Sequence, residues 1–129
     1  MKRERLTQIV LLIVGLLNLA ILYPLFMDLW HSSWLRQKTE IEPMFLSFFI
    51  PVGVSLLVAI RRPSEYRSMI ALAAWLHISH GTVMAIQSVE AWIHGVHRNF
   101  TDVIVFLVLG GVLLALLPAK RKVVEPALA

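Results

Sequence analysis

The chain has 129 residues, of which 58% are hydrophobic and 16% are charged, with a formal net charge of +4 and no cysteine. Soluble domains usually run near half apolar and about a quarter charged, so this composition excludes an ordinary soluble domain. It also excludes a disordered chain, which needs few apolar residues and many charges. The lack of cysteine excludes disulfides, thiolate metal sites and thiol–disulfide chemistry.

Four apolar stretches bounded by charge predict four membrane spans, at residues 6–30, 43–60, 68–89 and 101–118. A helix needs roughly 20 apolar residues to cross a hydrocarbon core of about 30 Å. The first and third stretches meet that length, whereas the second and fourth need their polar flanks to reach the interface. Short loops make neighbouring spans antiparallel. The expected fold is all-α, an integral-membrane four-helix transmembrane bundle, with residues 1–129 forming a single transmembrane domain.

The lysines and arginines are distributed unevenly between the two sides of the predicted bundle. One side collects Lys2, Arg3, Arg5, Arg61, Arg62, Arg67, Lys120, Arg121 and Lys122, and the other has Arg36, Lys38 and Arg98. By the positive-inside rule, both termini are expected in the cytoplasm of a bacterial inner membrane, with the lipid bilayer as the surrounding partner. The basic residues are divided among the ends of the predicted helices, so they indicate how the chain is oriented in the membrane. Because they form no single patch, we expect no nucleic-acid binding.

Prolines and small residues indicate how the spans deviate from straight, isolated helices. Pro24 in the first span and Pro51 in the second are expected to bend or locally unwind their helices. In the fourth span, Gly110 and Gly111 with Ala115 form a strip of small residues that favours close helix contact.

Several polar side chains fall at membrane depth, where they are costly and normally face the bundle interior. At 1.5 Å of rise per residue, Asn18 lies roughly 18 Å from the cytoplasmic end, and His77 and His80 lie about 14 to 18 Å in. Ser47 lies at a similar depth, so the four could form one midplane cluster. The residues expected to contact a ligand or carry protons are Asn18, His77, His80, Met84 and Gln87.

The pair His77 and His80 allows two interpretations. Two histidines at i and i+3 can share a metal ion, and histidine titrates near neutral pH, which would suit a metal, haem or proton-relay site. Alternatively, both are neutral and hydrogen-bonded to Asn18, a serine or backbone carbonyls. A bis-histidine haem needs ligands on two facing helices, and here the histidines at membrane depth share one helix. One chain therefore could not build that site, although a homodimer could.

A second group of candidate ligands follows the third span. If the helix continues beyond the membrane, Glu90, His94 and His97 at i, i+4 and i+7 share one face. That spacing suits a divalent metal, and Asp28 or His31 could complete the site. The alternative is a solvated loop at the membrane interface.

Short matches along most of the chain connect it to a known family. They are Lys2 to Leu6, Gly15-Leu16, Tyr23-Pro24-Leu25, Leu29-Trp30, Arg62-Pro63-Ser64, Arg67-Ser68, Ala74-Trp75, His80, Val83-Met84-Ala85, Gln87 and Pro118-Ala119-Lys120. With these residues the chain resembles a family of small bacterial four-helix membrane proteins known only as a domain of unknown function. The resemblance implies no activity, cofactor or site residue.

The function expected from these patterns is non-enzymatic. No nucleophile–base pair, phosphate loop or paired carboxylates lie within the predicted membrane spans, and we expect no cofactor. The leading interpretation is a small accessory or interaction subunit with a membrane-protein partner or a second copy as its partner. One alternative is a transporter or binding protein for a small ligand or protons, and another is a metal- or haem-binding redox protein.

Overall fold

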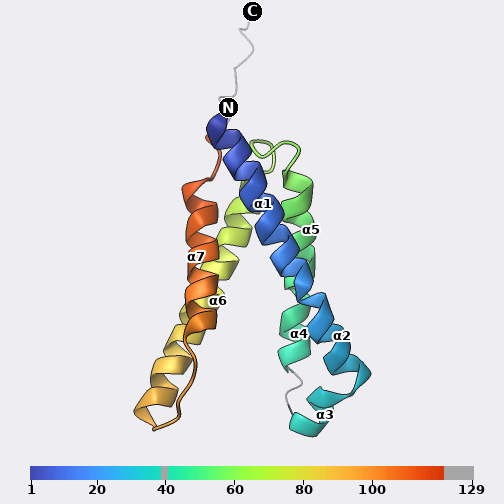
Figure 1. Ribbon diagram of the computed structural model, residues 1–129, viewed down its shortest axis with the longest axis vertical. Coiled ribbons are helices and arrows are strands. Elements are labelled where there is room, and N and C mark those ends of the chain that lie inside the picture. Colours follow the sequence, from blue (N-terminus) through green and yellow to red (C-terminus); the bar gives the residue numbers. More distant parts are fainter. Residues whose placement is uncertain (39–40, 121–129) are drawn as a thin grey trace, which may run out of the picture.

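The computed structural model describes residues 1–38 and 41–120, and within these ranges its regular structure is helical. The helices are α1 (Lys2–Ala20), α2 (Leu22–Trp30), α3 (Ser33–Gln37), α4 (Ile41–Ser47), α5 (Phe49–Ala59), α6 (Arg67–Ile93) and α7 (Thr101–Ala115) (Figure 1). Three stretches are long and apolar enough to cross a membrane: Lys2–Trp30, Ile41–Ala59 and Arg67–Ile93. The all-α fold is confirmed, and so are three helices of membrane-spanning character.

The fourth predicted span is shorter than expected. Helix α7 has 15 residues, which correspond to about 22 Å of helix, less than a hydrocarbon core of about 30 Å. The helix ends at Ala115, three residues before the predicted end of the span at residue 118. Pro118 prevents the helix from continuing further, because a proline disfavours the helical conformation in the residue before it, here Leu117.

The first two spans are each divided by a break that a proline follows. Helix α1 ends at Ala20 and α2 begins at Leu22, with Pro24 as its third residue. Likewise α4 ends at Ser47 and α5 begins at Phe49, with Pro51 as its third residue. Proline has no N–H to donate to the carbonyl four residues earlier, and its ring clashes with that carbonyl. The predicted local interruptions at both prolines are therefore confirmed.

Helices α1 and α5 pack as one hairpin, and α6 and α7 pack as the other. Glycines allow both contacts. A Cβ on Gly53 would lie 2.8 Å from the carbonyl oxygen of Gly15, and a Cβ on Gly110 would lie 2.7 Å from that of Ala74. By contrast, a Cβ on Gly111 would meet nothing within 4 Å. The predicted small-residue strip thus contributes Gly110 to the hairpin, while Gly111 faces outwards.

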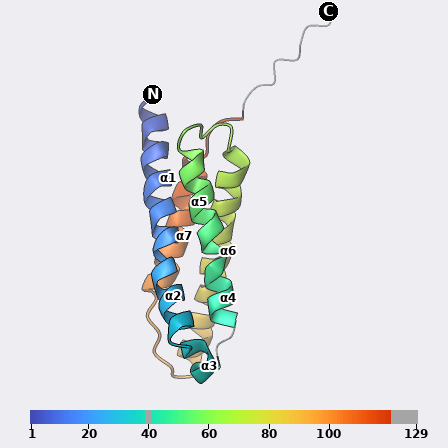
Figure 2. The ribbon, with the colours of Figure 1, turned by 90° about the vertical axis from the view of Figure 1, so that its right-hand side faces the viewer.

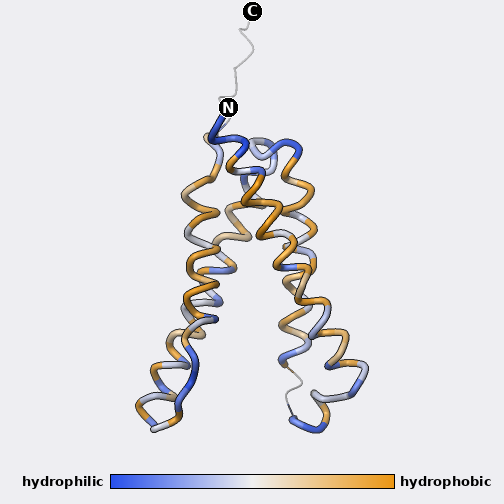
Figure 3. The backbone as a smooth tube through the Cα atoms, viewed as in Figure 1, coloured by the Kyte–Doolittle hydropathy of each residue, from blue (hydrophilic) through white to orange (hydrophobic). Residues whose placement is uncertain are grey.

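The two hairpins join at one end and diverge toward the other (Figure 1). In the perpendicular view they overlap and their helices run side by side (Figure 2). At the closed end (residues 1–8, 59–67 and 113–120), side chains bond to carbonyl groups of other segments, such as Gln8 to Ile60 and Arg67 to Pro118. The core lies between this end and the middle and consists of Leu11, Val14, Leu56, Ala59, Ile70, Ala73, Ala74 and Leu113. The open end comprises residues 28–38, 41–45 and 92–102. Hydrophilic residues gather at both ends and hydrophobic ones along the hairpins (Figure 3).

Candidate functional site

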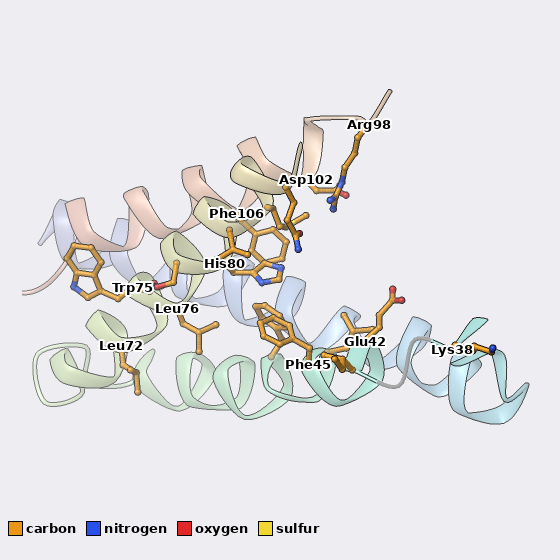
Figure 4. Close-up of a pocket in the computed structure, with 17 residues that line it drawn as sticks. Lys38, Glu42, Phe45, Leu72, Trp75, Leu76, His80, Arg98, Asp102 and Phe106 are labelled. Carbon is orange, nitrogen blue, oxygen red and sulfur yellow. The ribbon is translucent and has the colours of Figure 1, made fainter. Parts of the chain in front are cut away.

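A cavity of about 1160 Å³ lies between the diverging hairpins (Figure 4). Its walls come from α4 and the start of α5 on one side and from α6 and α7 on the other. Along α6 it extends from Leu72 to Gln87, about 22 Å at 1.5 Å per residue. Most of its lining is apolar or aromatic, and four charged residues, Lys38, Glu42, Arg98 and Asp102, lie toward the open end. The cavity is therefore amphipathic along its length.

His80 is the polar side chain at the centre of this cavity. It is the middle residue of α6, thirteen positions from either end. Three phenylalanines surround its ring: Phe45 stacks on it at 5.0 Å between ring centroids, and the edges of Phe49 and Phe106 meet it at 5.3 and 4.4 Å. These rings come from α4, α5 and α7, so His80 connects both hairpins through an aromatic cage.

The ring nitrogens of His80 differ in their hydrogen bonding from those of His77, in the same helix, and of His94, the C-cap residue of that helix. Nδ1 of His77 and of His94 each bonds the carbonyl four residues back, at 2.7 and 2.8 Å. His80 makes no such bond, and its ring nitrogens have no hydrogen-bond partner among residues 1–38 and 41–120. In Figure 4 the ring points into the cavity. His80 is thus a polar group available to whatever enters.

His77 and Asn18 form a separate buried pair. His77 is 1% exposed and Asn18 is 2% exposed. Because Nδ1 of His77 donates to the carbonyl of Ala73, its Nε2 is left to accept the Nδ2–H of Asn18 at 3.2 Å. Asn18 gives its other N–H to the carbonyl of Val14 at 2.7 Å. Both ring nitrogens of His77 are occupied, so this pair connects α1 to α6 and leaves no free nitrogen for a metal.

The predicted ligand-contacting residues therefore fall into two groups. His80, Met84 and Gln87 line the cavity, whereas Asn18 and His77 are buried and bonded to each other. Ser47 does not join either group: it is exposed, and its hydroxyl donates to the carbonyl of Met44 at 2.6 Å. The predicted midplane cluster was wrong in this respect, because Ser47 lies at the end of α4 with its side chain exposed and bonded within its own helix.

The aromatic cage was not predicted from the sequence. Phe45 and Phe49 lie one helical turn apart, a spacing that places them on one face of a helix. Their spacing was a usable signal. It did not indicate a site, because phenylalanines at helical spacing in an apolar span are equally expected to face lipid or the core. The third ring, Phe106, comes from α7 and enters the cage only through tertiary packing.

The predicted metal-ligating group Glu90, His94 and His97 does not form. Helix α6 ends at Ile93, so the condition that it continue as a helix is not met. Gly95, with φ of +76°, ends it: the N–H of Val96 bonds the carbonyl of Ala91 and that of Gly95 bonds the carbonyl of Trp92, which is a Schellman motif. Among the described residues, no three His, Asp or Glu side chains lie close enough to hold a metal ion.

Comparison with known proteins gives a family match over nearly the whole chain. A family model described as "Family of unknown function (DUF6632)" matches residues 2–127. This match confirms the resemblance to a family known only as a domain of unknown function. No curated protein and no solved structure matches the chain.

Proposed function

The chain belongs to DUF6632, a family of unknown function, and since that membership brings no activity with it, we propose a function from the geometry of the cavity. We propose that the protein is a non-enzymatic membrane protein that binds an amphipathic, lipid-soluble small molecule between its two hairpins. The observation that carries the proposal is the cavity of about 1160 Å³ with His80 at its centre.

The chemistry of the lining supports a ligand of this class. Binding sites for small molecules are mostly apolar and contain a few polar groups that orient the ligand. Here the apolar part includes Leu72, Leu76 and Val83, which would hold an acyl or isoprenoid chain. The polar part is His80 in the middle and the charged residues at the open end. A purely polar ligand would leave most of this surface unmatched.

The proposal places the protein in a bacterial inner membrane as a four-span bundle, with α7 and its flanking residues as the fourth span. The positive-inside rule supports termini in the cytoplasm, because the closed end carries Arg3, Arg5, Arg61 and Arg62. With this orientation the open end lies in the outer leaflet. A ligand dissolved in the bilayer would then enter laterally between the diverging hairpins.

Photo-crosslinking in nanodiscs tests the proposal. The probe is a palmitic acid with a diazirine in the middle of its chain, and labelled peptides are identified by mass spectrometry. We expect labelling concentrated on the cavity walls of α4, α5 and α6. Val83→Trp adds a large side chain to the lining, and we expect it to reduce that labelling.

Ile86→Trp is the matched control. Ile86 lies three residues further along the same helix, is 61% exposed and does not line the cavity. We expect this variant to be labelled like the wild type. Labelling spread evenly over the outward-facing apolar residues, and equal in both variants, would contradict the proposal because it would describe annular lipid alone.

The other functions expected from the sequence have less support. An accessory subunit with a membrane-protein partner or a second copy stays a prediction, and it is compatible with ligand binding. The metal alternative has less support within one chain, since both ring nitrogens of His77 are hydrogen-bonded and Glu90, His94 and His97 do not gather. A haem shared by a homodimer stays a prediction.

A further inference from the structure

The proposed ligand-binding function can be extended to the chemistry of the ligand head group, and this inference depends on that function. We propose that the cavity binds a planar ring with oxygen atoms on opposite edges and a long apolar tail, the chemistry of an isoprenoid quinone. The ring would lie beside His80, between the aromatic cage and Gln87, and the tail would follow the apolar wall.

The position of His80 requires a polar partner. At the midpoint of a 27-residue helix, it lies where water is scarce, and a polar group without a hydrogen bond is costly there. Yet its ring nitrogens are unpaired within the described parts of the chain, unlike those of His77. A lipid-soluble ligand with a hydrogen-bonding oxygen at midplane depth would satisfy this group. An ordinary phospholipid would not, because its polar atoms remain at the interface.

The cage indicates that the head group is flat. Phe45 stacks on the His80 ring with an interplanar angle of 22°, and Phe106 meets it edge-on at 65°. Aromatic rings prefer offset-stacked or edge-to-face neighbours, so this arrangement offers favourable contacts to a further planar ring. A branched or globular head group would gain less from it.

Gln87 supplies a second polar contact at a suitable spacing. It lies seven residues after His80, on the same face of α6 and about 10 Å further along the axis. Its side chain is exposed and lines the cavity. Met84 lies between the two and also lines the cavity; its flexible thioether packs well against aromatic surfaces. The pair can therefore contact oxygens on opposite edges of one ring.

Tryptophan fluorescence provides the test, since Trp75 lines the cavity. The full chain in phosphatidylcholine nanodiscs is titrated with decylubiquinone, and quenching gives an apparent Kd. We expect saturable quenching that Trp75→Phe largely removes. Replacing His80 by Phe removes one hydrogen bond and should weaken binding by about tenfold. His80→Gln keeps a hydrogen-bonding group and should retain most of the affinity.

His31→Phe is the control, because His31 is exposed and lies outside the cavity. Each variant is first shown by circular dichroism to keep its helix content. Equal affinity for the wild type and the His80→Phe variant, or quenching that does not saturate, would overturn the inference. If decylubiquinone also fails to displace the diazirine fatty acid while that probe still labels the cavity, the quinone inference is wrong and the ligand-binding proposal remains.

Discussion

The closed and open ends of this molecule are built from the same helices, but they are held together differently. At and next to the closed end, buried residues such as Leu11, Leu56 and Leu113 pack between the hairpins. Polar side chains there also bond carbonyl groups of other segments, as Thr7 does with Leu116. Toward the open end the hairpins separate, and the space between them is the cavity (Figures 1 and 4).

The difference follows from where the small residues and prolines lie. Gly15 and Gly53 allow close packing of α1 on α5 before the breaks at Ile21 and Phe48 are reached. Beyond those breaks, α2 and α4 continue as a separate pair, and α6 and α7 continue on their own course. The comparison shows how a chain with four apolar stretches can be rigidly packed at one end and still hold a ligand-sized cavity at the other.

Replacing Gly110 by Ala should have the largest effect on the free energy of unfolding. Its Cβ would lie 2.7 Å from the backbone oxygen of Ala74 and 2.6 Å from Cγ1 of Ile78, and such overpacking typically costs about 1–3 kcal/mol. Thermal unfolding and SDS titration in detergent measure the loss. Gly111→Ala, which meets nothing within 4 Å, is the matched control. Equal stability of the two variants would mean that the α6–α7 contact does not hold the hairpin.

The bond between Asn18 and His77 should contribute a smaller amount. A double-mutant cycle with Asn18→Leu and His77→Leu isolates the coupling, which for buried hydrogen bonds between membrane helices averages about 0.6 kcal/mol and reaches about 1.7. The same cycle with Asn18→Leu and His31→Leu should give a coupling near zero, since His31 is exposed. Equal coupling energies in the two cycles would mean that the bond between Asn18 and His77 does not stabilise the contact between the two hairpins.

Pro51→Ala should change stability least but should alter the open end. Pro51 lies in the first turn of α5, where a missing N–H costs little, so we expect a change within about 0.5 kcal/mol. Restoring the N–H should straighten α4 onto α5. Because the chain has no cysteine, spin labels can be placed uniquely at Met44→Cys and Val96→Cys.

Electron paramagnetic resonance then measures the distance between the two labels. We expect the distribution at the open end to shift in the Pro51→Ala variant, while labels at Ser64→Cys and Ala115→Cys, at or near the closed end, keep theirs. A shift at both ends, or at neither, would show that the proline break does not separate the two regions.

The proline breaks and the face of α6 follow from local rules, and these were predictable. The pairing of Asn18 with His77 joins two distant helices, and the sequence offered it only as one of two interpretations. Ala73, His77, Gly81 and Ser88 are spaced at helical intervals and are buried as that spacing indicates. The end of α6 could also be predicted from the sequence, because a glycine such as Gly95 readily adopts the left-handed conformation that commonly ends a helix. The metal site predicted from Glu90, His94 and His97 depended on a helix that continues beyond the membrane, a condition that this cap excludes.

The sequence by itself determined that the chain is helical and apolar enough to span a membrane, because periodicity, proline position and apolar length act locally. Tertiary structure alone decided that the hairpins diverge, that His80 rather than His77 faces the space between them, and that Phe45, Phe49 and Phe106 surround it. Those outcomes depend on the angle at which one hairpin crosses the other. That angle depends on contacts between residues far apart in the chain that connect the two hairpins, such as Thr7 with Leu116 and Asn18 with His77.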